Sequence, residues 1–171
     1  MSGAAPQGDA TFRAAIAIVL MHEGGLVDDP DDAGGLTNMG ITLRDHPALG
    51  ADGIRNLTRE DAIAIYWTDW WVRYRFGQLP ASIAGKVFDL AVNVGAGTAV
   101  AGLQRAVNAL GHHLVVDGAI GAQTCQAALG CDPRALHAAF AAQMAAHYRA
   151  IVAAHPADAK FLAGWLARAA A

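Results

Sequence analysis

The stretch HEGGLVDDPDDAGGLTNMGIT, residues 22–42, follows a short apolar segment and is rich in carboxylates and glycine. It holds one glutamate, four aspartates and five glycines, and it contains no lysine or arginine. This composition predicts that a helix ends here and that a shaped loop follows, in which GLTNMGIT supplies a short hairpin. The stretch therefore predicts a small irregular or β element directly after the first helix.

Helical signals dominate the rest of the chain. Apolar residues recur at helical spacing over residues 10–23, and alanine, which favours helix, is abundant throughout. Thr58 begins a capping box that predicts a helix to about Phe76. Pro80 and Pro133 each open a further predicted helix. We expect a mainly α fold of about seven helices with one small irregular or β element.

The composition of the chain argues against two classes of partner, nucleic acid and the membrane interior. The chain has 171 residues, 54% of them hydrophobic, which suffices for a substantial core. Its net charge of −3 and the lack of a basic stripe argue against binding to nucleic acid. The apolar run from Ala14 to Met21 is far shorter than the roughly 20 residues that span a bilayer. We expect no membrane-spanning segment, no cleavable signal peptide and synthesis in the cytoplasm.

Two cysteines, Cys125 and Cys131, lie close together without histidine or cysteine partners nearby, which makes a poor zinc site. Buried thiols are the simpler interpretation, and a disulfide stays open if the protein works outside the cytoplasm. Neither these residues nor the aspartates of the loop match a metal-binding motif, so we expect neither a metal ion nor an organic cofactor.

The chain contains only two glutamates, Glu23 and Glu60. Glu60 lies in the first turn of a predicted helix, where the macrodipole favours a carboxylate. Glu23 lies at the end of a helix, where the dipole opposes a negative charge, and glycines beside it give a bulky substrate access to the backbone. We interpret Glu23 as a candidate general acid, and a solvated glutamate at a helix end is the alternative.

A second catalytic group is expected among the residues that follow. Glycoside hydrolysis requires another carboxylate, or a polar group that orients water, across the cleft from the acid. Asp32 and Thr37 are the candidates, and the order of acid, aspartate and hydroxyl resembles that of T-even phage lysozymes, with Asn38 at the matching hydroxyl position. The alternative is that the aspartates only form turns.

Aromatic residues cluster within residues 66–76 at helical spacing, which is typical of a core. Tryptophan and tyrosine rings also stack on sugar faces, and Trp70 is our candidate for such a platform. The histidines form no metal-binding or triad pattern, and no nucleotide-binding motif is present.

Five segments follow one another along the chain: HEGG, DPDDAGGLTNMGIT, FDLAVNVG, LQRAVNALG and VDGAIGAQT. Together they resemble glycoside hydrolase family 108, a family of small N-acetylmuramidases, and the match runs from about residue 12 to the end. The resemblance implies a lysozyme-like lobe, residues 10–97, packed against a lobe similar to peptidoglycan-binding modules, residues 98–171, with one compact domain as the alternative.

The resemblance also implies roles for individual residues. It makes Glu23 the catalytic acid and places Asp32, Thr37 and Asn38 opposite it. Asp89 and Asn93, four residues apart on one predicted helix face, would bind the saccharide. The alternative for this pair is a set of hydrogen bonds that holds helices together.

The sequence thus favours a monomeric lysozyme that cleaves the β-1,4 bond between N-acetylmuramic acid and N-acetylglucosamine in peptidoglycan. It would act in the periplasm or cell wall. An endolysin released by a holin, a gene-transfer or secretion-system lysozyme and a toxic effector would have the same sequence features, so the delivery route stays open. A lytic transglycosylase, a non-catalytic wall-binding module and a structural partner protein are the alternatives. Whether the reaction inverts or retains the anomeric centre depends on a carboxylate separation that a sequence does not contain.

Overall fold

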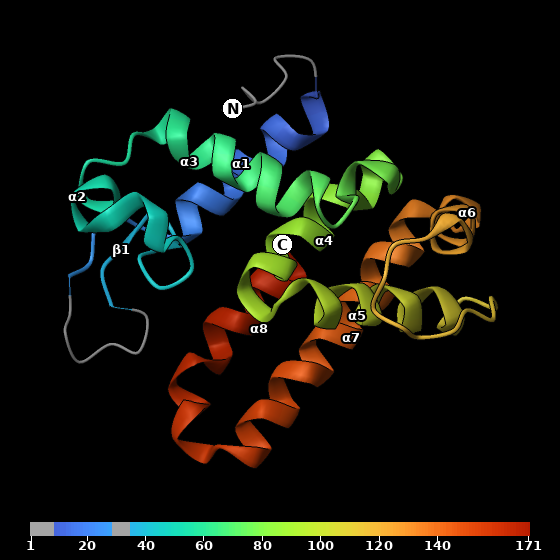
Figure 1. The fold of residues 1–171 in the computed structure, drawn as a ribbon. Coiled ribbons are helices and arrows are strands. Elements are labelled where there is room, and N and C mark those ends of the chain that lie inside the picture. Colours follow the sequence, from blue (N-terminus) through green and yellow to red (C-terminus); the bar gives the residue numbers. More distant parts are fainter. Residues whose placement is uncertain (1–8, 29–34) are drawn as a thin grey trace. The chain divides into compact units, whose positions relative to one another are not determined.

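The computed structural model describes residues 9–28 and 35–171 (Figure 1). The chain divides after Arg73 into two compact units, which we describe separately. Across the described residues there are eight α-helices and one two-stranded sheet, so the predicted mainly α fold is confirmed. The division into lobes 10–97 and 98–171 stays a prediction.

The first unit begins with helix α1, Ala10–His22, as predicted. Asp9 caps it by accepting a hydrogen bond from the Phe12 backbone N–H at 2.8 Å, and the other oxygen of Asp9 accepts one from Trp71 Nε1 at 3.0 Å. The buried face of α1 includes Phe12 and Val19. The helix ends at Glu23, whose N–H still donates to Val19, and Gly24 then takes a left-handed φ of +72°. That conformation favours glycine and turns the chain out of the helix.

A minimal hairpin follows the loop. Strand β1, Thr37–Asn38, pairs antiparallel with strand β2, Ile41–Thr42. Met39 and Gly40 between them both have positive φ, 49° and 77°, which is the pattern of a type I′ turn. Val27 pairs with Thr37 on the other edge through backbone hydrogen bonds of 2.8 and 2.9 Å. The hairpin predicted from GLTNMGIT is therefore confirmed.

Short helices complete the first unit. They are the 3₁₀ helix Pro47–Leu49, α2 at Gly50–Arg55, α3 at Arg59–Tyr66 and a π-helix at Trp67–Val72. The Thr58 capping box is present, but the prediction of one helix to about Phe76 is wrong. The α-helical hydrogen bonding stops at Tyr66, and the left-handed φ of Arg75, 62°, ends any continuation.

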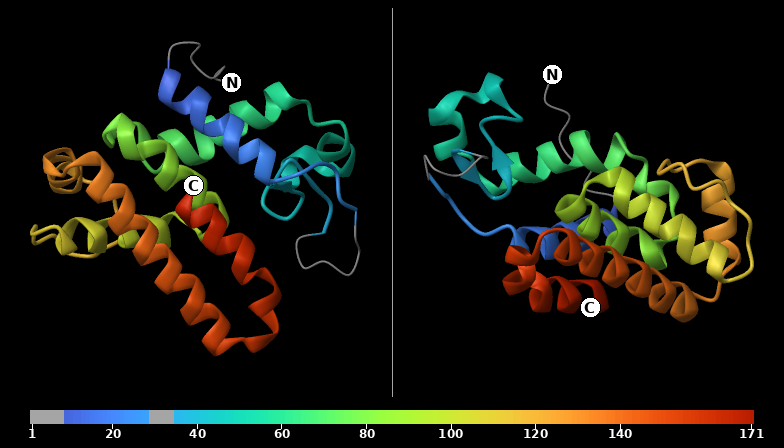
Figure 2. Two further views of the ribbon diagram at one scale, coloured as in Figure 1. Left: turned by 180° about the vertical axis from the view of Figure 1, so that it is seen from behind. Right: turned by 90° about the horizontal axis from the view of Figure 1, so that it is seen from below.

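The second unit is a bundle of helices (Figure 2). In chain order they are the 3₁₀ helix Phe76–Gln78, α4 at Ala81–Val94, α5 at Ala96–Ala109, α6 at Ala122–Gly130, α7 at Pro133–Ala154, the 3₁₀ helix Pro156–Phe161 and α8 at Leu162–Ala170. Helix α5 packs against α4 and α7, and α8 folds back along α7. Buried Phe88, Leu103 and Phe140, one from each of α4, α5 and α7, contribute to the core.

None of the helices within the described ranges has the length and hydropathy needed to cross a bilayer.

Cys125 and Cys131 are both free thiols, and burial raises the pKa of each. A raised thiol pKa lowers the fraction of thiolate at neutral pH. Because the thiolate is the nucleophile, neither cysteine is activated for reaction.

Candidate functional site

Glu23 lies half-buried at the C-terminal end of α1. The backbone pairing of Val27 with Thr37 ties the segment after Glu23 to the hairpin. As a result, Gly40 in the hairpin turn approaches the glutamate side chain: a Cβ added at Gly40 would lie 3.1 Å from both Cγ and Oε2 of Glu23. The glutamate therefore lies against the hairpin turn.

Tyr66 lies at the same place. Its side chain is 1% exposed, and its hydroxyl donates a hydrogen bond of 3.2 Å to the backbone oxygen of Met39. A Cβ at Gly40 would overlap this hydroxyl. Three segments distant in sequence thus meet at one point: the end of α1, the hairpin turn and the end of α3.

This crowding gives a prediction for Gly40→Ala. The added methyl group must displace Glu23 or the Tyr66 hydroxyl, and displacement of Glu23, the predicted general acid, should lower the rate by about 10- to 100-fold. The positive φ adds a stability loss of about 1–2 kcal/mol. The hydrolytic rate of the variant and its urea midpoint of unfolding measure the two effects.

Gly35→Ala is the matched control, because Gly35 also has a positive φ, 64°, but none of the described residues beyond its chain neighbours lies within 4 Å of its Cβ position. It should lose a similar backbone contribution to stability and keep its activity. Equal activity loss in both variants would contradict the proposed crowding at Gly40.

Thr37 and Asn38 both lie on β1. The Thr37 hydroxyl is half-buried and donates to the backbone oxygen of Gly35 at 3.2 Å, which leaves its oxygen able to accept a hydrogen bond. Asn38 is 8% exposed, and its Nδ2 donates to the backbone oxygen of Ile54 at 3.0 Å. The Asn38 amide therefore joins the hairpin to α2.

Asp32 lies outside the described residues. Of the four aspartates in the opening stretch, Asp28 is described, and its carboxylate forms an ion pair of 3.1 Å with Arg55 on α2. Both side chains are about half exposed, at 54% and 44%, so this pair contributes little to stability.

Trp70 lies in the π-helix and is partly exposed. Its ring centroid is 6.5 Å from that of Tyr66, whereas the neighbouring Trp71 is buried and packs against Phe12 at 5.4 Å. Trp70 and Tyr66 are thus ring neighbours, and Tyr66 contacts the hairpin turn that faces Glu23.

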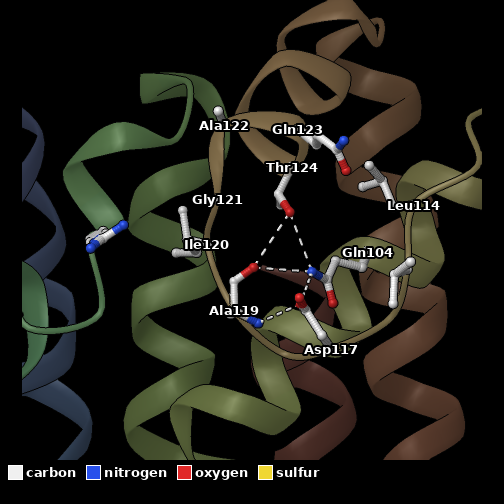
Figure 3. A pocket seen from close by; sticks show the side chains of 11 residues that line it. Gln104, Leu114, Asp117, Ala119, Ile120, Gly121, Ala122, Gln123 and Thr124 are labelled. Carbon is white, nitrogen blue, oxygen red and sulfur yellow. Dashed lines mark hydrogen bonds between the residues drawn. The ribbon is translucent and has the colours of Figure 1, made fainter.

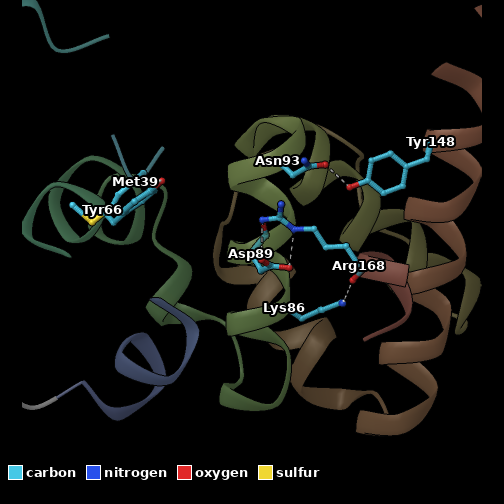
Figure 4. A network of polar contacts seen from close by, with 7 residues as sticks. All are labelled: Met39, Tyr66, Lys86, Asp89, Asn93, Tyr148 and Arg168. Atoms are coloured by element: carbon cyan, nitrogen blue, oxygen red, sulfur yellow. Dashed lines mark hydrogen bonds and ion pairs between the residues drawn. The ribbon is translucent and has the colours of Figure 1, made fainter. Parts of the chain in front are cut away.

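In the second unit, Asp89 forms a buried ion pair between α4 and α8 (Figure 4). Arg168 Nη2 lies 2.9 Å from Asp89 Oδ1 and Nε lies 3.3 Å from Oδ2, with side-chain exposures of 12% and 7% for the arginine and the aspartate. Lys86 donates a hydrogen bond to the backbone oxygen of Arg168, and burial lowers the pKa of the Lys86 ammonium group. These contacts match the structural alternative for Asp89, in which its hydrogen bonds hold two helices together.

Asn93 lies one turn further along α4 and is exposed. Its Oδ1 accepts a hydrogen bond of 2.6 Å from the hydroxyl of Tyr148 on α7 (Figure 4). Burial raises the pKa of Tyr148 to about 12, so this hydroxyl keeps its proton at neutral pH and remains a donor. The pair ties α4 to α7.

Comparison with known proteins identifies the family. Residues 16–95 match the family model of glycosyl hydrolase 108, and residues 98–170 match the model of a predicted peptidoglycan domain. The solved structure of Brucella abortus SagA is 30% identical, with a TM-score of 0.75 over 95% of this chain and 91% of the SagA chain. The chain belongs to the glycosyl hydrolase 108 family. No match to a curated protein was found.

The resemblance inferred from the sequence motifs is therefore confirmed. This glycosyl hydrolase 108 chain is a glycoside hydrolase that acts on peptidoglycan. Its family motifs fall on distinct structural features. The HEGG motif ends α1, the TNMGIT motif makes the hairpin, and the FDLAVNVG motif ends α4.

Tyr66 lies at the candidate site of this glycosyl hydrolase 108 chain, and the sequence did not predict it there. It appeared only as one ring in an aromatic run, and ring spacing along a helix carries no information about a distant hairpin turn. The nearest sequence signal was Gly40 in the TNMGIT motif, because a glycine in a short turn indicates a positive φ or a close approach.

Proposed function

We propose that this chain is an N-acetylmuramidase that cleaves the β-1,4 bond between N-acetylmuramic acid and N-acetylglucosamine, with Glu23 as the general acid. The observation that carries the proposal is the position of Glu23, half-buried where α1 ends and held against the hairpin turn at Gly40. A catalytic acid needs a fixed carboxyl group that substrate can still reach.

In the proposed reaction the Glu23 carboxyl group donates its proton to the glycosidic oxygen as that bond breaks. An oxocarbenium-like sugar forms while the Glu23 proton leaves on the departing sugar. A water molecule then attacks the cation and releases one proton to the Asp32 carboxylate or to solvent, and Glu23 is reprotonated from solvent. Thr37 or Asp32 orients the water. The contact of Thr37 supports this role, because a hydroxyl that donates to Gly35 can accept from water with its lone pairs.

Substrate contacts are proposed on the same unit. The half-exposed Trp70 ring offers a face on which a sugar can stack. Asn38 uses its Nδ2 on the backbone of Ile54, so its carbonyl oxygen is the group proposed to accept from a sugar hydroxyl. Asp89 is left out of the proposed binding surface, because its carboxylate is buried against Arg168.

Asn93 is retained as a proposed saccharide ligand on the second unit. It is exposed, and its carbonyl oxygen already accepts from Tyr148, so its amide nitrogen is the group that would donate to a sugar. We further propose that the enzyme acts as a monomer in the periplasm or cell wall after release from the cytoplasm or dedicated export.

Product analysis tests the reaction type. The protein is incubated with purified peptidoglycan in isotopically labelled water, and mass spectrometry identifies the soluble fragments. A muramidase yields reducing N-acetylmuramic acid ends that carry the water label. Unlabelled anhydro ends would identify a lytic transglycosylase, and binding without soluble fragments would identify a wall-binding module. Either of these results overturns the proposal.

A further inference from the structure

The loop between α5 and α6 is held by a buried glutamine of α5. Gln104 is 1% exposed, and its Nε2 donates to Asp117 Oδ1 at 2.7 Å and to the backbone oxygen of Ala119 at 3.1 Å. Its Oε1 accepts from the backbone N–H of Gly118 at 2.9 Å. One side chain thus fixes three consecutive residues of the loop.

A second amide, one turn further along α5, holds the start of the same loop. Asn108 Nδ2 donates to the backbone oxygen of Leu114 at 2.9 Å, and Asn108 Oδ1 accepts from the Leu114 N–H at 2.6 Å. Gly118 has a left-handed φ of +72°, and a Cβ there would lie 2.8 Å from the backbone oxygen of Gly97. The D-G-x-x-G-x-x-T turn, residues 117–124 of the VDGAIGAQT segment, is therefore a hydrogen-bonded scaffold that requires glycine at Gly118.

A pocket of about 410 Å³ opens beside this scaffold, entirely within the second unit (Figure 3). Its volume lies in the range of small-molecule sites, about 300–1,000 Å³. Because the loop backbone is already ordered, a ligand would not have to pay the entropy of arranging it.

The lining combines opposite charges with aliphatic surface. Arg75 and Asp117 both line the pocket and are both exposed, and Leu114, Val115 and Ile120 supply apolar contacts. The hydrogen bond from Gln104 lowers the pKa of Asp117, so this group is a carboxylate at neutral pH. Both hydrogen bonds that Asp117 accepts from Gln104 and Ala119 reach Oδ1.

This lining does not suit a sugar ring. None of the described residues around the pocket is aromatic, so no ring is available for stacking on a saccharide face. A ligand that carries both a carboxylate and an ammonium group on an aliphatic body matches the arginine, the aspartate and the apolar side chains together. The peptide stems of peptidoglycan, which carry free carboxylates and a diamino acid, have this chemistry.

We infer that this pocket, lined by Arg75 and Asp117, binds the peptide stem of peptidoglycan, with Arg75 on a carboxylate and Asp117 on an ammonium group. The inference deepens the proposed function and rests on it, because glycan and peptide belong to the same polymer. The second unit would then hold the wall by its peptides while the site around Glu23 cuts the glycan.

The test uses the full chain, isotope-labelled for NMR, and a synthetic tripeptide that ends in a diamino acid with a free amine and a free carboxylate. We expect saturable shifts at the backbone amides of Leu114, Ala119 and Gln123. Arg75→Gln and Asp117→Asn should each weaken binding by about two- to fivefold, because solvent screens charge pairs made by exposed side chains. Arg134→Gln, an exposed arginine on α7 that does not line the pocket, should bind as the wild type does.

Blocked peptides make the assignment specific. Acetylation of the amine should remove the effect of Asp117→Asn, and amidation of the carboxylate should remove that of Arg75→Gln. Equal binding of free and blocked peptides, shifts outside the pocket, no shifts, or tighter binding of a peptide-free disaccharide at these amides would each overturn the inference.

The outcome is independent of the chemistry at Glu23, since the peptide has no glycosidic bond and Glu23→Gln should bind it unchanged. If the wild-type protein cuts glycan but does not bind the peptide, only the assignment of the pocket is overturned. A protein that binds the peptide but leaves the glycan intact would support the pocket and overturn the muramidase proposal.

Discussion

Glu23→Gln lowers the rate of peptidoglycan hydrolysis by about 10²- to 10⁴-fold, the range that a general acid contributes. Glutamine keeps the size of the side chain but has no acidic proton to give to the leaving oxygen. We therefore expect kcat to fall while the affinity for insoluble wall stays within about twofold, since only a transition-state interaction is lost. Turbidity loss of a peptidoglycan suspension and a wall pull-down measure the two quantities.

Glu60→Gln is the matched control. Glu60 is the other glutamate of the chain and lies exposed in the first turn of α3, so the same substitution there should leave the rate unchanged. Circular dichroism of both variants establishes that they fold. If folded Glu23→Gln clears the suspension as fast as Glu60→Gln does, Glu23 is not the general acid.

Asp89→Ala lowers the free energy of unfolding by about 3–5 kcal/mol, because it leaves the Arg168 guanidinium buried opposite an alanine. Folding removes water from the Arg168 guanidinium, and the substitution removes both of its hydrogen bonds to the Asp89 carboxylate. Urea denaturation with a fixed m-value measures the change.

Two further variants separate a buried ion pair from a general loss of packing. Asp28→Ala breaks the exposed pair with Arg55 and should cost less than about 1 kcal/mol. The double variant Asp89→Leu with Arg168→Met removes both charges and should be more stable than Asp89→Ala alone. If Asp89→Ala loses no more than Asp28→Ala, the pair does not hold α8 to α4.

The candidate site was predictable in part. Glu23 stood out because its position at a helix end followed by glycines is unusual, and the TNMGIT motif indicated a hairpin in which Thr37 and Asn38 would lie. The contact of Gly40 with both Glu23 and Tyr66 was not predictable, because it joins α1, the hairpin and α3 through their packing. No local pattern records which helix end a turn will face.

Asp89 illustrates the same limit on the second unit. Spacing correctly put Asp89 and Asn93 on one helix, but it could not tell a ligand for sugar from a partner for another helix. Their partners, Arg168 and Tyr148, lie 79 and 55 residues further along the chain. Only the packing of α4 against α7 and α8 shows that the Asp89 carboxylate is paired with Arg168.

The sequence by itself determined the helical class, the capping box that begins α3, the hairpin turn and the family to which the chain belongs. These features depend on side chains that act on backbone within three or four residues, or on motifs that keep their order along the chain. Only the tertiary structure decided that Tyr66 meets Gly40 beside Glu23, that Asp89 pairs with Arg168, and that the D-G-x-x-G-x-x-T turn is fixed by Gln104. Such contacts depend on where the packing of apolar faces brings distant segments together, and that packing is a property of the whole fold.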